Sequence, residues 1–207
     1  MELKDRFRGY LPVALDLETG GFEAVHNPLL EVACSFFGFE DQLLSVKTTH
    51  AWSVVPFEGS MVDPASLKFT GIDLQDRHPP AVDEREALSA FFQLVRAEMK
   101  VRGCHRAVMV AHNAAFDAGF LNAACVRQNV KRNPFHPFTT IDTAALGAVA
   151  YGHTVLRVIC RRAGIDFEND QAHRAAYDVE RTAQVFCRMV NSWPLTTANW
   201  SAQDSDS

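Results

Sequence analysis

Four carboxylates and one histidine fall in three short blocks of this sequence, and their types suit metal-dependent phosphate chemistry. The first block holds Asp16 and Glu18, the second holds Asp117, and the third holds His173 and Asp178. Each carboxylate stands in an apolar stretch, where burying a lone anion costs free energy. Divalent cations are the usual means of holding several carboxylates at one point, and phosphate chemistry is their usual task. The three blocks therefore predict a metal-dependent nuclease.

The spacing within the blocks is compatible with one shared site. Asp16 and Glu18 are two residues apart on a predicted strand, so both side chains point to the same side. Asp117 follows a strand near the start of a helix, and Asp178 lies in the first turns of the last helix. His173 precedes Asp178 by five residues, about 140° apart on a helix, so the two share a site only if His173 stands on the preceding loop.

Structural roles compete with this interpretation. An aspartate at a strand end is often a turn or capping residue, and a single histidine is more often structural than catalytic. The pair Asp16 and Glu18 is harder to explain in this way, because two anions on one face of an apolar strand repel each other. The three blocks taken together favour the catalytic interpretation.

The pattern of apolar residues predicts an α/β domain that would position these blocks. We expect strands at residues 10–17, 29–37, 44–54 and 107–111. We expect helices at residues 64–68, 82–100, 116–129, 143–150, 155–163 and 174–190, with Thr154 capping the fifth and Gly164 ending it. Residues 133–138 are expected to form a loop, because their two prolines bar a helix. The continuous apolar run at 107–111 is typical of a sheet covered by helices on both faces.

Length and composition fit one soluble domain. The chain has 207 residues, of which 47% are hydrophobic and 22% charged. We place the domain at residues 5–195 and expect a polar, disordered tail at 196–207. No apolar run is long enough to span a bilayer, and no signal-peptide core follows the charged N-terminus, so a cytoplasmic location without a membrane partner is expected. Five scattered cysteines without Cys-x-x-Cys spacing argue against a zinc site or a disulfide framework.

The net charge of −5 is the main argument against a nucleic-acid partner, because such proteins are commonly basic. At least four of the negative charges would belong to the metal site, where bound cations reverse the local sign. The basic residues also gather in local clusters, which matter more than the total when a flexible polyanion binds.

The order Asp-x-Glu, Asp, then His-x-Ala-x-x-Asp resembles the DEDDh superfamily of 3′-to-5′ exonucleases. The tyrosine subclass of that group has its tyrosine four residues before the last aspartate, where this sequence has Arg174. Within the histidine subclass the resemblance is to the ribonuclease T family, over about residues 5–195. It rests on Asp5-Arg6-Phe7-Arg8-Gly9, Phe69-Thr70-Gly71-Ile72-Asp73, Met109-Val110-Ala111-His112-Asn113-Ala114, Lys131-Arg132-Asn133-Pro134-Phe135-His136-Pro137-Phe138 and Asp142-Thr143-Ala144-Ala145-Leu146.

This resemblance implies a ribonuclease H-like fold, with a mixed central sheet flanked by helices on both faces, and two Mg²⁺ ions that Mn²⁺ can replace. One ion would be held by Asp16, Glu18 and Asp178, and the other by Asp16 with Asp117 acting through water. His173 would take a proton from the attacking water, because the ordinary histidine pKa of about 6.5 suits a base near neutral pH.

The resemblance also implies residues that bind substrate. Phe22, Phe69, Phe116 and Phe138 would stack on terminal bases, whereas helical context alone favours a core role for Phe69 and Phe116. A basic patch that works in a homodimer would comprise Arg6, Arg8, Lys100, Arg106 and Lys131. One departure is Ala65, which stands where the family has an acidic residue that contacts the base.

The implied activity is trimming of single-stranded 3′ ends of structured RNAs, above all tRNA precursors and small stable RNAs, with release of nucleoside 5′-monophosphates. Single-stranded DNA ends are a further expected substrate. A proofreading exonuclease subunit and an oligoribonuclease are the enzyme alternatives, and a non-catalytic RNA-binding module is the alternative from another class.

Overall fold

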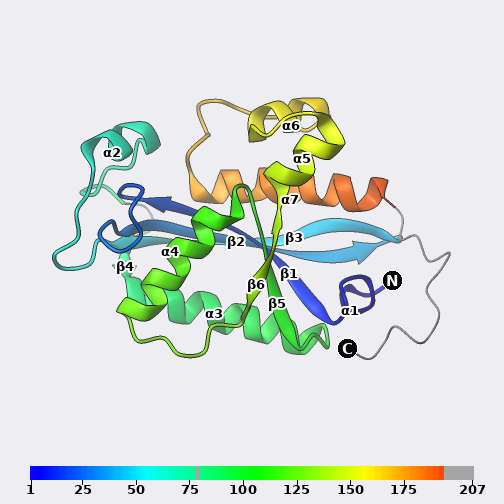
Figure 1. Cartoon of the computed structure of the whole chain (residues 1–207), viewed down its shortest axis with the longest axis horizontal. Helices are drawn as coiled ribbons and strands as arrows, with labels where there is room; N and C mark the ends of the chain where they lie inside the picture. The colour runs from blue at the N-terminus through cyan, green and yellow to red at the C-terminus, as the bar shows by residue number, and fades with distance from the viewer. Residues whose placement is uncertain (78–79, 194–207) are drawn as a thin grey trace.

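A six-stranded mixed sheet forms the centre of the fold, with the strand order β4-β3-β2-β1-β5-β6 (Figure 1). The computed structural model describes residues 1–77 and 80–193. β1 pairs antiparallel with β2 and parallel with β5, so it lies at the middle of the sheet. The strands are β1 (Tyr10–Thr19), β2 (Leu29–Glu40), β3 (Leu43–Val55), β4 (Val82–Asp83), β5 (Arg106–Ala111) and β6 (Phe135–Asp142).

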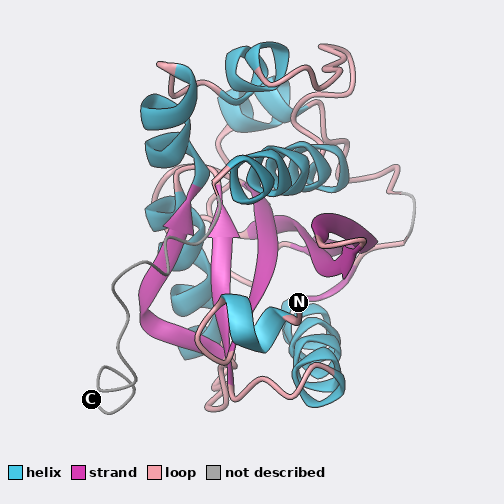
Figure 2. Cartoon of the chain, turned by 90° about the vertical axis from the view of Figure 1, so that its right-hand side faces the viewer, coloured by secondary structure: helices cyan, strands magenta, loops and turns pink. Residues whose placement is uncertain are grey.

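Helices cover both faces of this sheet (Figures 1 and 2). Helix α7 packs on β1, β2 and β3 from one side, with α5 and α6 against it, and α3 and α4 pack on the other side. The helices are α1 (Leu3–Arg6), α2 (Pro64–Thr70), α3 (Glu84–Val101), α4 (Ala114–Arg127), α5 (Thr143–Tyr151), α6 (Leu156–Arg162) and α7 (Ala175–Ser192). The predicted mixed sheet between two helical layers is confirmed.

Apolar burial explains this arrangement. On β5, residues 107–111 are all buried, as expected for a strand covered on both faces. On α7, Val179, Ala183 and Phe186 form a buried stripe at helical spacing, which fixes the face that the helix turns to the sheet. Burial of a side chain of valine or phenylalanine size contributes about 1.5–3 kcal/mol, so this stripe determines how α7 is placed.

The prediction of a loop at residues 133–138 is wrong, because β6 begins at Phe135. Proline is tolerated here for two reasons. β6 is an edge strand, and the register jumps from Phe135 opposite Ala107 to Thr140 opposite Met109. Pro137 therefore falls in an irregular stretch where no ladder hydrogen bond is lost.

Two further boundaries differ from prediction. Val82 and Asp83 pair with β3 as a short strand, and the helix predicted from residue 82 begins at Glu84. The N-cap of α6 is Val155 without a side-chain hydrogen bond, so Thr154 does not cap this helix. The expected tail at 196–207 lies outside the described residues. Among the residues described, no single helix has the length and apolar character to cross a membrane, and only the bent pair α5 and α6 passes that test jointly.

Candidate active site

The carboxylates of the first block lie at the C-terminal end of β1, in the middle of the sheet. Glu18 is 9% exposed, and it faces the same neighbouring carboxylates as Asp16. β2 pairs with β1 on one side at this point, with Asp16 opposite Ala33 and Glu18 opposite Glu31, whereas the pairing with β5 ends at Ala14. The sheet therefore places two carboxylates close together where Glu18 is buried and Asp16 is half-buried, so water screens their repulsion less than at an exposed surface.

Asp117 approaches the carboxylates of β1 from α4, which belongs to the helical layer on the other face of the sheet from α7. It lies in the first turn of α4 and is 4% exposed. Its Oδ1 accepts a hydrogen bond from the backbone N–H of Leu17, at 3.1 Å, and Leu17 is the residue between Asp16 and Glu18. This bond ties the start of α4 to the strand that carries the other carboxylates.

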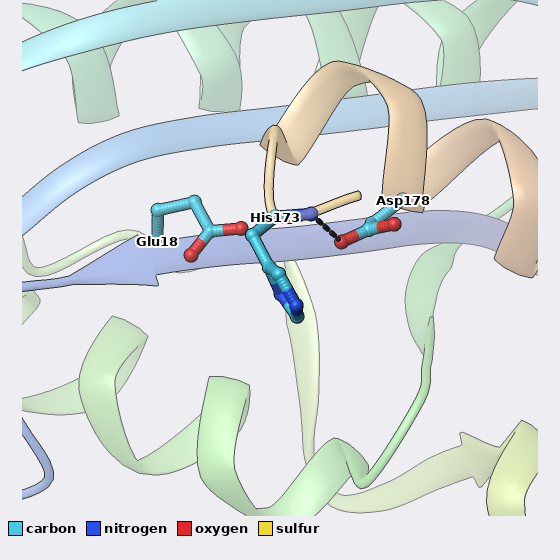
Figure 3. A group of neighbouring side chains, drawn as sticks. All are labelled: Glu18, His173 and Asp178. Carbon is cyan, nitrogen blue, oxygen red and sulfur yellow. Dashed lines mark hydrogen bonds between the residues drawn. The ribbon is translucent and has the colours of Figure 1, made fainter. Parts of the chain in front are cut away.

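Asp178 and His173 come from α7 and the turn before it (Figure 3). The backbone N–H of His173 donates to Oδ2 of Asp178 at 2.9 Å, and His173 has a left-handed backbone with φ of 66°. One ligand atom from each of Glu18, His173 and Asp178 lies within 4.8 Å of the others. His173 therefore stands on the loop before the helix, which is the condition that allows it to share a site with Asp178.

Electrostatics confirm that the carboxylates crowd together. Burial, then repulsion by Asp117, Glu18 and Asp178, raises the pKa of Asp16 well above its ordinary value. Burial and neighbouring carboxylates raise the pKa of Glu18 to about 8, and burial raises that of Asp117 to about 8. The pKa of Asp178 is also raised by burial, although the His173 N–H opposes the shift. Without a cation, these groups hold protons that they would lose in water.

The residues present fit a divalent cation. Oδ1 of Asp178 is buried and has no hydrogen-bond partner, which is costly for a carboxylate oxygen unless a ligand completes it. Carboxylate oxygens are the ligands that hard cations such as Mg²⁺ and Mn²⁺ prefer. Asp16 and Asp117 stand outside the close group of Glu18, His173 and Asp178, but they are electrostatically coupled to it. The cluster therefore presents four interacting carboxylates as possible cation ligands.

An aromatic groove adjoins the carboxylates. It has a volume of about 380 Å³, and Glu18 is among its lining residues together with Phe22, Phe69 and Phe116. Phe22 is 83% exposed and Phe69 is 66% exposed, and the Phe69 ring centroid lies 4.0 Å from that of His173. Such exposure shows that Phe22 and Phe69 are not core residues. Phe116 is half-buried and packs against the core, so it is both a core residue and a wall of the groove.

Phe138 is not among the residues that line this groove. It is 90% exposed in the irregular stretch of β6, beside His136. The structure thus brings together three of the four predicted stacking residues.

The predicted basic patch lies at the opposite end of the sheet. Arg106 is paired with Tyr10 at the start of β1, and Arg8 lies against the Tyr10 ring. Tyr10 and Glu18 are separated by eight strand residues, or roughly 26 Å at about 3.3 Å each. Arg6 is close to these residues in α1, Lys100 borders the groove beside α1, and Lys131 is exposed in the segment before β6. The basic residues do not reach the carboxylates of their own chain.

Two residues near the site were missed from the sequence. Glu31 of β2 is directly opposite Glu18 in the strand pairing, and no feature of the sequence marks it until the register is known. His112 is half-buried and bridges Thr143 Oγ1, at 2.9 Å, and the Thr154 carbonyl, at 2.7 Å. Burial lowers its pKa, so the neutral ring serves as a structural link between β5 and the α5–α6 region.

Comparisons with known proteins identify the family of this chain. A family model named RNase_T and described as an exonuclease matches residues 13–186. Ribonuclease T of Shewanella sp. (strain W3-18-1) is 47% identical over 213 residues, which cover 100% of this chain and 95% of that protein. Ribonuclease T of Shewanella putrefaciens (strain CN-32 / ATCC BAA-453) shows the same identity and coverage.

Solved structures share the fold at lower identity. A full-length 3′-exonuclease superposes with a TM-score of 0.70 at 18% identity, over 88% of this chain and 62% of that one. E. coli exonuclease I in complex with a dT13 oligonucleotide gives a TM-score of 0.65 at 16% identity, over 86% of this chain and 40% of that one. At such identities the likeness shows a common architecture.

Proposed function

The chain belongs to the ribonuclease T family of 3′-to-5′ exonucleases, and on that premise we propose that it trims single-stranded 3′ ends of structured RNA. The observation that carries this proposal is the continuity between the carboxylate cluster and the aromatic groove, which share Glu18. A terminal nucleotide stacked in the groove has its phosphate beside the cluster. tRNA precursors and small stable RNAs are the substrates that we propose, with single-stranded DNA ends as a further one.

The proposed cofactor is Mg²⁺, two ions per site, with Mn²⁺ as a substitute. Asp16, Glu18 and Asp178 would hold one ion, and Asp16 with Asp117 the other. When bound, such ions stabilise the charge on the attacking and leaving oxygens of a phosphodiester. The unpartnered Oδ1 of Asp178 and the protons retained by Glu18 and Asp117 support this assignment.

His173 is the proposed general base. Its ring packs against that of Phe69, and it offers a nitrogen within 4.8 Å of carboxylate oxygens of Glu18 and Asp178, which Figure 3 draws beside it. The imidazole takes a proton as the water oxygen attacks phosphorus, the bond from phosphorus to O3′ of the penultimate nucleotide breaks, and the leaving O3′ takes a proton from solvent. The products are a nucleoside 5′-monophosphate and a chain one residue shorter with a new 3′ hydroxyl.

Recognition by stacking explains why a trimming enzyme accepts many sequences. A base stacked on an aromatic side chain gains about 1–3 kcal/mol whichever base it is. Ala65 lines the groove where a carboxylate would be needed to read the base edge. A terminal-base preference that depends on a carboxylate at this position is therefore not expected. Phe138 is proposed to stack on a nucleotide outside the groove.

We propose that the protein acts as a homodimer in the cytoplasm. The basic patch of Arg6, Arg8, Lys100, Arg106 and Lys131 is too distant to guide a short 3′ tail into the site of its own chain. In a homodimer, the basic patch of one subunit could bind the phosphates of an RNA whose 3′ end enters the carboxylate cluster of the other subunit. The distance within one chain would then no longer matter.

A gel tests the proposed activity. A 5′-labelled stem–loop RNA with a short 3′ overhang is incubated with the protein and Mg²⁺, beside a duplex DNA with a mismatched 3′ end. A ladder of one-nucleotide steps that stops beside the RNA stem supports the proposal. Intact RNA with rapid loss of the mismatched DNA end indicates a proofreading enzyme instead, and binding without cleavage of either indicates a binding module.

A further inference from the structure

Glu31 is a fifth carboxylate beside the active site, and it belongs to the strand next to the catalytic one. The antiparallel pairing of β1 and β2 places Glu31 directly opposite Glu18, so both side chains are on the same face of the sheet. Its charge adds to the repulsion on both Asp16 and Glu18. A further anion in this position adds to the electrostatic cost of the cluster.

The backbone contact of Glu31 identifies its role. Its Oε2 accepts a hydrogen bond from the N–H of Ala175, at 3.1 Å, which is the first residue of α7. The N-cap residue of that helix is Arg174, whose side chain makes no capping bond. Ala175 is fully buried, so water cannot satisfy its N–H in place of Glu31. Glu31 therefore supplies from the sheet the cap that the helix lacks.

The capped turn carries two residues of the site. His173 lies two residues before Ala175 and Asp178 lies three after it. The N–H of Asp178 bonds to the carbonyl of Arg174, and the N–H of His173 bonds to Oδ2 of Asp178. These hydrogen bonds hold residues 173–178 in one conformation. The hydrogen bond to Glu31 joins this turn to β2, next to Glu18.

We propose that Glu31 is a positioning residue for the exonuclease reaction, a role that rests on the proposed function. By holding the N-terminus of α7 on β2, its carboxylate sets the placement of His173 and Asp178 relative to Glu18. The guanidinium of Arg77, which donates to the carbonyl of Leu30, interacts electrostatically with Glu31, and Arg174 lines the same pocket. The Arg77 guanidinium compensates part of the charge that Glu31 brings.

Two substitutions separate the hydrogen bond from the charge. Glu31→Gln keeps an acceptor oxygen and removes the charge, whereas Glu31→Ala removes both. Glu40→Ala is the matched control, because it removes an exposed glutamate from the other end of the same strand. Each variant is assayed for kcat and KM on a single-stranded 3′ end, and for Mg²⁺ affinity by calorimetry on the protein alone.

The expected result is a loss of about 10–100-fold in kcat and in Mg²⁺ affinity for Glu31→Ala, as for other residues that orient metal ligands, with KM little changed. Glu31→Gln and Glu40→Ala should stay close to the unsubstituted protein. Equal losses of kcat and Mg²⁺ affinity in Glu31→Gln and Glu31→Ala would overturn the proposal, because they would show that the charge of Glu31 matters and not its hydrogen bond. Unchanged kcat and Mg²⁺ affinity in Glu31→Ala would show that Glu31 has no positioning role.

Amide hydrogen exchange at Ala175 covers the case in which Glu31→Ala folds poorly. Glu31→Gln should retain protection of this amide, and Glu31→Asp, whose carboxylate is one methylene shorter, should lose it while the sheet amides stay protected. Protection retained in Glu31→Asp would refute the capping role. If the unsubstituted protein degrades no RNA or DNA, the proposed function has failed, but the exchange and Mg²⁺ measurements still decide the role of Glu31.

Discussion

Binding of Mg²⁺ at pH 7 should release about two protons per chain, or more. Burial and crowding raise the pKa values of Glu18 and Asp117 to about 8. A carboxyl group with such a pKa is about nine-tenths protonated at pH 7 and about one-tenth protonated at pH 9. Since the cation binds the ionised form, these two groups release about 2 protons at pH 7 and about 0.2 at pH 9. Asp16, whose pKa is raised well above its ordinary value, adds to the number at pH 7.

The same shifts determine how stability depends on pH. Folding raises the pKa values of Glu18 and Asp117, so the folded protein binds their protons more tightly than the unfolded chain does. The stability that these protons give the metal-free fold is fully present below the ordinary carboxyl pKa and is lost as the pH rises through about 8. Mg²⁺ should therefore raise the melting temperature more at pH 9 than at pH 5.

Calorimetry in two buffers of different ionisation enthalpy, such as PIPES and Tris, gives the proton count directly. Asp117→Asn should lower the count at pH 7 by about one, because it removes one titrating group. Glu98→Gln is the control, since Glu98 pairs with Arg102 on α3 outside the site, and it should leave the count unchanged. A count near zero at pH 7 would contradict the raised pKa values, because the cluster would then be ionised without a cation.

Three further predictions concern catalysis, substrate binding and stability. His173→Ala should lower kcat by about 10²–10⁴-fold at an unchanged melting temperature, as expected for a general base; undiminished turnover would exclude this role. Phe22→Ala and Phe138→Ala should each weaken binding of a single-stranded 3′ end by about 1–3 kcal/mol in a titration, and at 83% and 90% exposure neither should lower stability. Glu84→Ala should lower the free energy of unfolding, measured with a denaturant, by about 3–5 kcal/mol, because Glu84 is 3% exposed and pairs with Arg127. A loss below about 1 kcal/mol would show that this ion pair contributes no more than an exposed one.

The residues that make up the candidate site could be predicted because local patterns position them. Two-residue spacing on a strand places Asp16 and Glu18 together, whatever the rest of the fold. The spacing of His173 and Asp178 required a loop before α7, and the structure has one. The apolar run of β5 indicated burial on both faces, which its buried residues confirm.

What could not be predicted depends on tertiary pairing. Glu31 becomes a neighbour of Glu18 only through the register of β1 and β2, which a single sequence does not specify. The two prolines at 134 and 137 predict a loop, but an irregular edge strand accepts Pro137. Phe138 shares its residue type and exposure with Phe22 but is not among the residues that line the groove, because location is a property of the fold.

We propose that Asp16, Glu18, Asp117 and Asp178 form one centre for divalent cations. An anomalous difference map from crystals of the protein grown with Mn²⁺ tests this arrangement. We expect two peaks enclosed by these four carboxylates, with one of them in contact with Oδ1 of Asp178. An ordered site without a peak, or peaks bound only elsewhere on the protein, would contradict it.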